Sequence, residues 1–471
     1  MSEEDKEVLH LVKKYESMID KNEKIWFDSI EYVDIIDYYH DNNSYSKAEE
    51  ATFRAYKLFP EDEEVAMRMA GIYVGKENYA TALEVLSPCL KKSASSLVYS
   101  TLASIYIESN QNIDEAERIL NKIIEEDKED YYFNYYLLGR IYLKRSQPDK
   151  AEPLIRKALL EDPEDDDILL YYIQCAEHGD KGIKQQILSI LEGIRDDYPF
   201  NDMLWQCIAA IHYDNGDLAK SLEALDYSIA IDNEDDTRHA LKADILVKLN
   251  KEYEAISELE EAIKYTKEPY AYYNNIGSLF FHKKNYAEAE KNYVHAWEAA
   301  GEMVLPSTLL GLVECYFLLN QPVLAKQTLE KAWSYGFDSQ VFLELAERLH
   351  ASGFINESEK IFSELLNDDD DDILLSALIA LSYISAENGN NIEAINILEE
   401  AIRNNLISKE LYFAMLVISC TDSKLFDYTK KALQKLYELG DYEKDIEKYY
   451  PDLLQNKNYQ QAQNEIKNGK L

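Results

Sequence analysis

One pattern of apolar and small residues recurs along the chain with a period of about 34 residues. Residues 134–142 read NYYLLGRIY and residues 272–280 read YYNNIGSLF. Each segment has an aromatic residue, then an aliphatic residue followed by glycine, then a second aromatic residue, at the same spacing. Apolar residues spaced by three and four positions are typical of amphipathic helices. A repeat of this size cannot bury its apolar face alone, so we expect the copies to stack as an array.

The same frame divides most of the chain into consecutive repeats of two helices. They lie at 29–62, 63–95, 96–131, 132–165, 168–201, 202–235, 236–269, 270–303, 306–338, 339–372, 375–408 and 409–442. A small residue opens the second helix at Ala48, Ala82, Ala116, Ala151, Ala255, Ala289, Ala325 and Ala394. We expect alanine where two helix backbones approach closely, because a larger side chain would force them apart. The copy at 168–201 fits least well, with Cys175 at the glycine position and Ile187 at the alanine position.

The two quoted segments continue with alanines at fixed distances, Ala151 and Ala158 in one copy and Ala289 and Ala296 in the other. This resembles the tetratricopeptide repeat, W-x2-L-G-x2-Y followed by A-x3-F and then P. The resemblance implies an all-α fold, a right-handed superhelical solenoid of antiparallel helix pairs with about twelve repeats over residues 29–442. We expect residues 1–28 to form an N-terminal capping helix, with a helical pattern over 3–27. Residues 443–471 should form a C-terminal helical cap and polar tail, with a helical pattern over 441–463.

Acidic runs stand at the junctions between repeats. The sequence DDDILL occurs at 165–170 and again at 370–375, each time directly before a first helix. The start of a helix carries unpaired N–H groups and a partial positive charge, which aspartate caps and offsets by about 0.5–2 kcal/mol. A calcium loop would need glycine at its sixth place and glutamate at its twelfth, and neither run has that pattern. We therefore predict helix caps at these runs.

The composition favours helices and disfavours polyanionic partners. The chain has 471 residues, of which 46% are hydrophobic, and its 15 Gly and 10 Pro leave little material for turns. Lys plus Arg number 49 against 89 Asp plus Glu, a net charge of −40. This charge repels phosphate backbones and anionic lipids and would favour a basic partner. We expect neither nucleic acid nor membrane as a partner.

The N-terminus has no signal-peptide pattern and no stretch of about 18 apolar residues occurs, so we expect a cytoplasmic protein. The five cysteines are widely spaced and form no CxxC pair, which is typical of core residues in a reducing compartment. A zinc site with a complete shell needs more ligands than the sequence offers at Cys175, His178 and the matching His212 of the next repeat. A phosphate-binding loop and the common hydrolase motifs are missing as well. We expect no enzyme activity, no cofactor, no metal and no small-molecule substrate.

The resemblance also implies where a partner would be held. In tetratricopeptide repeats, contacts come mainly from the second, fifth, ninth, twelfth and thirteenth positions of the first helix, which line a concave groove. Carried onto this chain, the implied contact residues are Phe133, Tyr136, Arg140, Lys144, Tyr172, Tyr213, Asn274, Phe281, Phe317, Tyr383 and Phe413. Aromatic residues in a groove commonly dominate binding energy. Tyr135 and Tyr142 are expected instead in the packed interior.

We therefore predict a non-enzymatic scaffold or adaptor that holds a protein or peptide segment, extended or helical, in an aromatic groove. Three alternatives stay open from the sequence. The chain could be a signalling receptor that closes on a short peptide, a regulatory subunit of an enzyme on a separate chain, or a structural subunit of a large assembly. A receptor should compact when its ligand is added, whereas a scaffold should keep its pitch.

Overall fold

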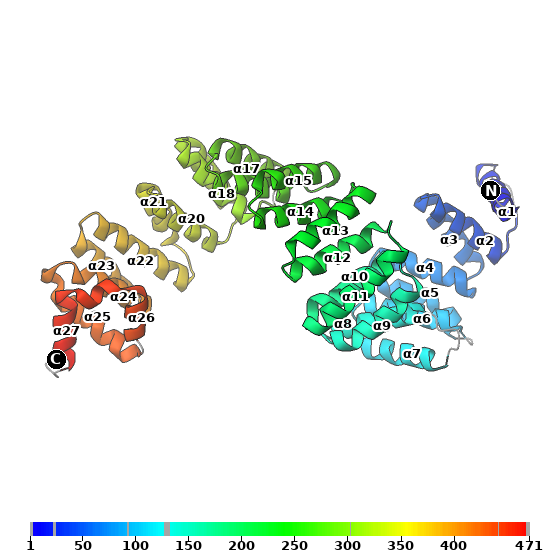
Figure 1. Ribbon diagram of the computed structural model, residues 1–471, viewed down its shortest axis with the longest axis horizontal. Helices are drawn as coiled ribbons and strands as arrows, with labels where there is room; N and C mark the ends of the chain where they lie inside the picture. Colours follow the sequence, from blue (N-terminus) through cyan, green and yellow to red (C-terminus); the bar gives the residue numbers. More distant parts are fainter. Residues whose placement is uncertain are drawn as a thin grey trace. The chain divides into compact units, whose positions relative to one another are not determined.

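The computed structural model describes residues 3–21, 25–91, 94–126, 132–301, 303–440 and 442–467. Within these ranges the regular structure consists of the α-helices α1 to α27 and two short 3-10 helices, without a strand (Figure 1). The chain divides into two compact units, unit 1 from Met1 to Arg238 and unit 2 from His239 to Leu471. Each unit is described by itself.

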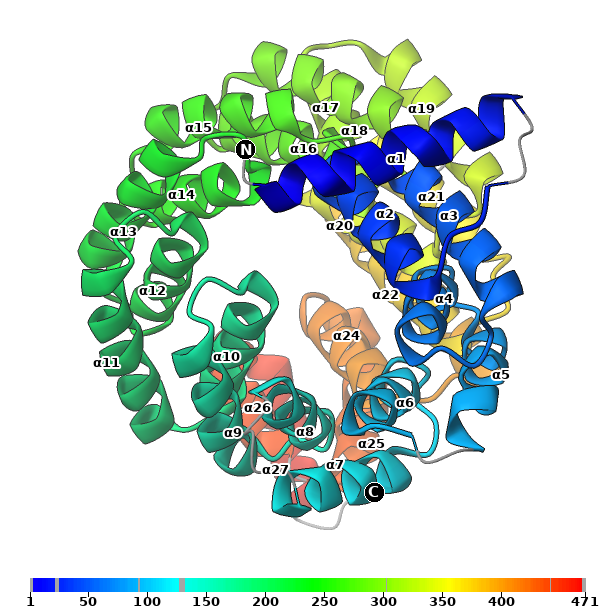
Figure 2. The ribbon, with the colours of Figure 1, turned by 90° about the vertical axis from the view of Figure 1, so that its right-hand side faces the viewer.

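Unit 1 opens with α1 (Glu3–Lys21) and continues as helix pairs. The first helices of these pairs are α2 (Ser29–Asp41), α4 (Glu63–Gly75), α6 (Ser96–Glu108), α8 (Tyr132–Lys144), α10 (Asp166–His178) and α12 (Asp202–Asp214). The second helices are α3 (Tyr45–Leu58), α5 (Tyr79–Leu90), α7 (Ile113–Glu126), α9 (Pro148–Glu161), α11 (Lys181–Asp197) and α13 (Leu218–Ile231). Figure 2 shows the first helices α4 to α12 on the inner side of the curve of unit 1 and the second helices on its outer side.

Unit 2 repeats this order after α14 (Asp236–Lys248), which runs from one unit into the other. Its further first helices are α16 (Tyr270–His282), α18 (Pro306–Leu318), α20 (Ser339–Ala351), α22 (Asp371–Glu387) and α24 (Lys409–Cys420). The second helices are α15 (Glu252–Tyr265), α17 (Tyr286–Ala300), α19 (Pro322–Tyr335), α21 (Ile355–Leu365), α23 (Asn391–Arg403) and α25 (Phe426–Leu439), the last preceded by η1 (Ser423–Leu425).

The helices pack in the order in which they follow along the chain. In unit 1 each first helix contacts the second helix of its pair, and the first helices of neighbouring pairs touch, as α4 does with α6 and α6 with α8. In unit 2 the same holds for α16 with α17 and with α18. Helices joined by short turns must run antiparallel. The predicted fold class, an all-α solenoid of antiparallel helix pairs, is confirmed.

The acidic runs cap helices, as predicted. The carboxylate of Asp165 accepts a hydrogen bond of 3.0 Å from the backbone N–H of Ile168 at the start of α10. Asp370 accepts the N–H of Ile373 at 3.3 Å at the start of α22. In both DDDILL copies the first aspartate is therefore the cap, and the next two lie in the first helical turn, where the positive end of the helix stabilises them.

A left-handed residue closes the turn inside most pairs. Residues with positive φ recur in these turns at Asn43, Glu77, Asn110, Ser146, Gly216, Asn250, Lys284, Asn320, Gly353 and Gly389. The next N–H then bonds back to the end of the first helix, for example Ser44 N to Tyr39 O at 2.8 Å and Asn78 N to Tyr73 O at 2.8 Å. These bonds satisfy carbonyls that the helix end would leave unpaired. Asn or Gly, which adopt this conformation at the lowest cost, stand at most of these positions, a recurrence that the sequence interpretation did not use.

Small residues sit where helices approach most closely. The alanines that open the second helices, from Ala48 to Ala394, are all 0% exposed. In unit 2 the ring of Tyr293 on α17 lies between Gly277 of α16 and Gly311 of α18. A Cβ added at Gly277 would stand 2.8 Å from Tyr293 Cδ1, and one added at Gly311 would overlap the hydroxyl end of the same ring. Glycine is thus required on both sides of the ring.

The pair α10–α11 departs from the sequence frame. The helix α10 begins at Asp166, two residues before the predicted repeat start. Leu169 and Tyr172 are buried in α10 at the positions that Tyr135 and Leu138 occupy in α8. The alanine position of α11 is occupied by Ile187, as predicted, and it is 0% exposed. Two extra residues therefore separate the core positions of α10 from those of α11. The positions predicted for the first helix of the repeat at 168–201 are wrong by two residues.

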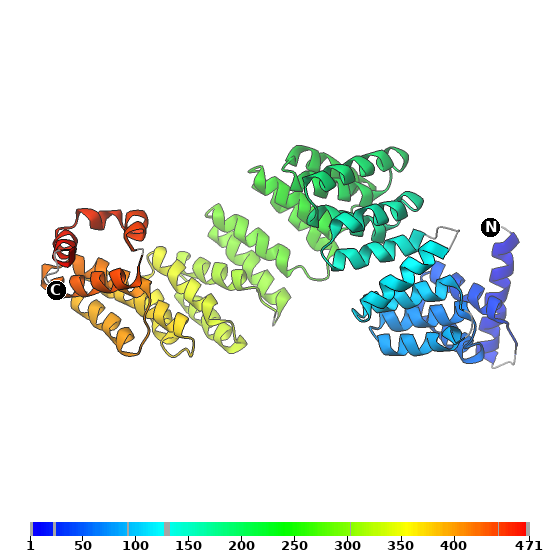
Figure 3. The same ribbon diagram turned by 90° about the horizontal axis from the view of Figure 1, so that it is seen from below.

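The ends of the chain pack on the terminal pairs. Val12 and Tyr15 of α1 are buried against α2, and Phe27 contacts the Tyr15 ring edge to face at 6.0 Å. The helical pattern predicted over 3–27 corresponds to α1, whose last residue is Lys21. The pattern over 441–463 is not one helix: α26 (Tyr442–Tyr449) stops before Pro451, which opens η2 (Pro451–Gln455), and α27 (Lys457–Lys467) follows. Proline stops the helix because it lacks the N–H that a continuing helix needs. Figure 3 shows this red segment folded against the orange helices α24 and α25.

We predict that Gly311→Ala destabilises the protein by about 1–3 kcal/mol, because the new Cβ would overlap the Tyr293 ring. Gly71→Ala is the matched control, since a Cβ there meets nothing within 4 Å inside the helix α4. It should stabilise by up to about 1 kcal/mol through helix propensity alone. Urea unfolding followed by circular dichroism measures both, and equal effects would contradict the close approach at Gly311.

Candidate partner-binding surface

The inner side of unit 1 carries an aromatic cluster around Arg140, which we call the Arg140 cluster (Phe133, Tyr136, Arg140 and Tyr171). The ring of Tyr136 lies 5.7 Å from Phe133 and 5.5 Å from Tyr171, centroid to centroid. The Arg140 guanidinium lies 4.7 Å above the Tyr171 ring and donates to Glu108 at 2.7 Å. These contacts join α6, α8 and α10 into one continuous face.

Burial limits what this cluster can offer to a partner. Tyr136 is 5% exposed and Arg140 is 8% exposed, whereas Phe133 and Tyr171 are half-buried. Burial raises the pKa of the Tyr136 hydroxyl above its usual range, so the group stays neutral. The Arg140 Nε finds no acceptor within the described part of the chain. Tyr136 and Arg140 therefore mainly support the face, and the edges of Phe133 and Tyr171 reach its surface.

Tyr172 does not belong to the groove. Its ring is 0% exposed and its hydroxyl donates to Glu152 of α9 at 2.9 Å. Burial and the Glu152 charge raise the pKa of this tyrosine. The sequence placed Tyr172 at a groove position because of the register error of two residues, and this prediction is wrong. Its neighbour Tyr171, which the sequence did not single out, takes part in the inner face.

A small cavity opens beside Phe133 on the same face. It has a volume of about 290 Å³ and is lined by Glu64, Met67 and Arg68 of α4, Leu97, Ser100 and Thr101 of α6, and Phe133 of α8. We call it the α4–α6–α8 cavity. Its floor is fixed by the Ser100 hydroxyl, which donates to Asn134 Oδ1 at 2.6 Å. Leu97 is 44% exposed, an apolar side chain that is open to solvent at the cavity.

The surroundings of this cavity are acidic. Arg68 is already paired with Asp37 at 2.7 Å and with Glu64 at 3.5 Å. Burial, together with the charges of Asp37, Asp28, Glu31 and Glu64, raises the pKa of Asp34. Burial is the largest cause of this shift, and the negative charges of the four neighbouring carboxylates add to it. The α4–α6–α8 cavity is therefore suited to an apolar side chain flanked by positive charge.

The remaining implied contacts of unit 1 lie further along the inner side. Lys144 at the end of α8 is exposed, and Tyr213 of α12 is half-buried. Neither belongs to the lining of the α4–α6–α8 cavity. Their contact role stays a prediction.

In unit 2 the implied contacts have different surroundings. Asn274 is 7% exposed and its Oδ1 accepts from Thr308 Oγ1 at 2.9 Å, so it joins α16 to α18. Phe281 packs against the Tyr286 ring at 5.5 Å and Phe317 against the Phe354 ring at 5.3 Å, and both phenylalanines are half-buried. Asn274 is thus buried in the contact between two helices, and its predicted partner contact stays a prediction.

The C-terminal segment covers the last two implied contacts. The Tyr450 ring, just after α26, stacks on Phe413 at 5.4 Å. Tyr450 is also a hydrogen-bond partner of Tyr383, and burial raises the pKa of Tyr383 above its usual range. Phe413 is 6% exposed as a result. Phe413 belongs to the buried core, so the prediction that it faces a partner is wrong, whereas Tyr383 is half-buried and its contact role stays a prediction.

Burial changes the protonation of several cysteine thiols. Burial raises the pKa of the Cys175, Cys207 and Cys315 thiols to about 12. The thiolate is the nucleophilic form, and it is scarce at neutral pH for such groups. The described residues contain no cluster of three or more His, Cys, Asp or Glu side chains suited to a metal ion. None of the described helices combines the length and apolar character that crossing a membrane requires.

The fold is that of a helical repeat protein. Its marks are the stacked helix pairs, the buried alanines, and the glycines on both sides of the Tyr293 ring. A family model described as the tetratricopeptide repeat matches residues 136–181 and 241–302. Over these two segments the predicted tetratricopeptide repeat is confirmed.

Solved structures with distant similarity were also found. Human IFIT1, as a dimer with PPP-AAAA, is 14% identical and aligns over 85% of this chain and 94% of that chain, with a TM-score of 0.39. The MamA protein is 18% identical over 36% of this chain and 92% of that chain, with a TM-score of 0.31. A thermophilic tetratricopeptide repeat protein of Thermus thermophilus is 14% identical over 40% of this chain and 100% of that chain, with a TM-score of 0.32. Comparison with curated proteins gives no match. At such similarity these structures say nothing about function.

We predict that Tyr172→Phe lowers the free energy of unfolding by about 1–3 kcal/mol, because it removes the hydrogen bond to the buried Glu152 carboxylate. Tyr171→Phe, one residue earlier and half-buried, should change it by less than about 0.5 kcal/mol. Chemical denaturation of both variants tests the register of α10. If Tyr171→Phe is the more costly change, the corrected register fails.

The buried thiols give a second prediction. All five cysteines are free and buried, so the folded protein should react slowly with Ellman's reagent at pH 8. The same protein in urea should react rapidly at every cysteine. Fast reaction of one thiol in the folded protein would identify an accessible cysteine that the structure does not show.

Proposed function

We propose that the chain is a non-enzymatic scaffold or adaptor that holds a segment of a partner protein along the inner side of unit 1. Tetratricopeptide repeats generally serve as protein-interaction scaffolds, and this supports the class. The α4–α6–α8 cavity supports the location, because three successive first helices contribute to it at their groove positions.

The size of this cavity favours a side chain of a bound peptide over a free metabolite. Sites for small ligands usually enclose roughly 300–1,000 Å³ and bury most of the ligand. The α4–α6–α8 cavity, at about 290 Å³, lies at the lower end and is open along the inner face. Leu97, Met67 and Phe133 offer apolar contact to one anchoring side chain. The neighbouring Arg140 cluster extends this surface toward α10.

Charge gives the partner its second property. The carboxylates around Arg68 and the net charge of −40 favour a segment with lysine or arginine beside its apolar anchor. The same field opposes nucleic acid and anionic membranes. A regulatory subunit of a separate enzyme and a peptide-sensing receptor would both use such a surface, and compaction on binding distinguishes the receptor.

Peptide display tests this proposal. A library of random peptides of about 12 residues should yield, on the full chain, sequences that combine a large apolar residue with Lys or Arg. Leu97→Ser should weaken binding of the selected peptides about tenfold or more, equivalent to roughly 1.4 kcal/mol, because it removes the open apolar contact. Fluorescence anisotropy of a labelled peptide measures the loss.

Leu160→Ser is the matched control. Leu160 is 56% exposed on the second helix α9, away from the inner side, and its loss should leave peptide affinity unchanged. Both variants should keep the wild-type circular dichroism. Equal binding by the two variants would place the peptide elsewhere, and selection of acidic peptides would refute the charge argument.

A further inference from the structure

The second helix α19 is poorly covered by the rest of unit 2. It buries only Ala325 and Ala332, whereas the equivalent helix α17 buries Ala289, Tyr293, Ala296, Trp297 and Ala300. Val323 at its start is 68% exposed, and Leu329 and Trp333 are only partly buried against the core. Apolar side chains along one helix that lack cover within their own unit mark a surface for another element.

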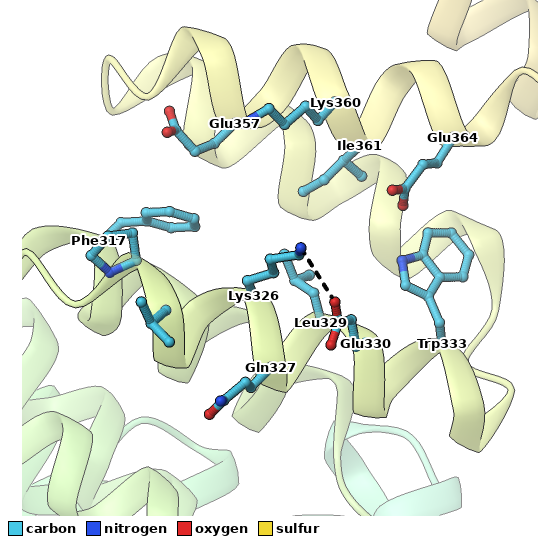
Figure 4. Close-up of a pocket in the computed structure, with 12 residues that line it drawn as sticks. Phe317, Lys326, Gln327, Leu329, Glu330, Trp333, Glu357, Lys360, Ile361 and Glu364 are labelled. Carbon is cyan, nitrogen blue, oxygen red and sulfur yellow. Dashed lines mark ion pairs between the residues drawn. The ribbon is translucent and has the colours of Figure 1, made fainter.

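A cavity of about 730 Å³ lies between α19 and the next second helix, α21. Figure 4 shows Lys326 and Glu330 reaching up from α19, and Ile361 and Glu364 reaching down from α21. Phe317 stands at one end and Trp333 at the other. The remaining lining includes Pro322, Val323, Gln327, Leu329, Glu357 and Lys360. We call it the α19–α21 cavity.

Its shape suits a helix laid between two helices. Val323 and Trp333 lie on the same helix about 15 Å apart, at 1.5 Å per residue, which is the length of about three helical turns. The two flanking helices run in the same direction in Figure 4. A third helix between them would cover Val323 and Leu329 with its own apolar stripe and pack beside Ile361, which is already buried.

The charges indicate a cation at one end of that helix. On the rim Lys326 pairs with Glu330 at 3.6 Å, and both side chains are well exposed. Among the described residues none pairs with the Glu364 carboxylate, which lies beside the Trp333 indole in Figure 4. One face of that indole is stacked on Phe342 at 3.5 Å. A carboxylate beside an indole is suited to arginine, because the guanidinium can pair with the carboxylate and pack on the indole ring.

We propose that the α19–α21 cavity binds a short amphipathic helix of a partner protein, about three to four turns long, with an apolar stripe and an arginine at the end near Trp333. Apart from Phe317 at the end of α18, this site is formed by second helices of unit 2. It is therefore separate from the surface proposed for unit 1 and does not depend on it.

The probe is a fluorescein-labelled helical peptide of about 14 residues, with leucines at helical spacing, one arginine at an end, and alanine and glutamine elsewhere. Two versions carry the arginine at the N- or the C-terminal end, and a third carries glutamate in its place. One arginine peptide should bind the full chain about tenfold tighter than the glutamate peptide. The preferred version gives the direction of the bound helix.

The double variant Val323→Ser with Glu364→Gln should weaken the preferred peptide about tenfold or more. The matched control is Ile392→Ser with Glu393→Gln on α23, where Ile392 is 64% exposed. It should bind as the wild type does, and so should Leu97→Ser of unit 1. Loss of binding in Leu97→Ser alone would assign the peptide to the unit 1 surface and overturn the proposal.

A label at the rim gives a second, independent readout. Because the native cysteines are buried, an environment-sensitive dye attached to Lys360→Cys should mark this position selectively. Its emission should shift when the preferred arginine peptide is added and stay constant with the glutamate peptide. The absence of saturable binding by every leucine peptide, or equal binding by the double variant and its control, would refute the site.

Discussion

The close approach of helix backbones at small residues is the contact on which the rest of this protein depends. Buried alanines open most second helices, and the glycines of α16 and α18 leave room for the Tyr293 ring. Each such contact fixes the distance between two helices, and therefore the position of the next pair. A larger side chain at one of these points would move every groove position beyond it, because a repeat is placed only by its neighbours.

The structure also separates two uses of aromatic residues. Tyr172 and Phe413 hold helices together in internal cores, while Phe133 and Trp333 border cavities that are open to solvent. Both kinds occur on helices with the same apolar spacing. What differs is whether a following element of the chain covers the ring. Both surfaces that we propose for partner binding, on the inner side of unit 1 and along α19, are places where such cover is missing.

The sequence predicted the repeat period, the helix caps and the alanine contacts, because each depends on residues close together in the chain or on one recurring position. It did not predict the register of α10, since two inserted residues shift the first helix without disturbing Ile187 in the second. It could not show that Tyr450 covers Phe413, because Pro451 redirects the chain and the covering contact depends on that path. The exposed side of α19 was equally invisible, since its apolar spacing resembles that of covered helices.

The Tyr293 ring touches glycines of two consecutive pairs, so its position cannot change in one pair alone. Withdrawing the ring from Gly311 also removes it from Gly277, and the helices on both sides lose their packing together. Under mechanical tension or in hydrogen exchange, α16, α17 and α18 should then open as one block rather than repeat by repeat. A single tyrosine thus couples the unfolding of two consecutive helix pairs.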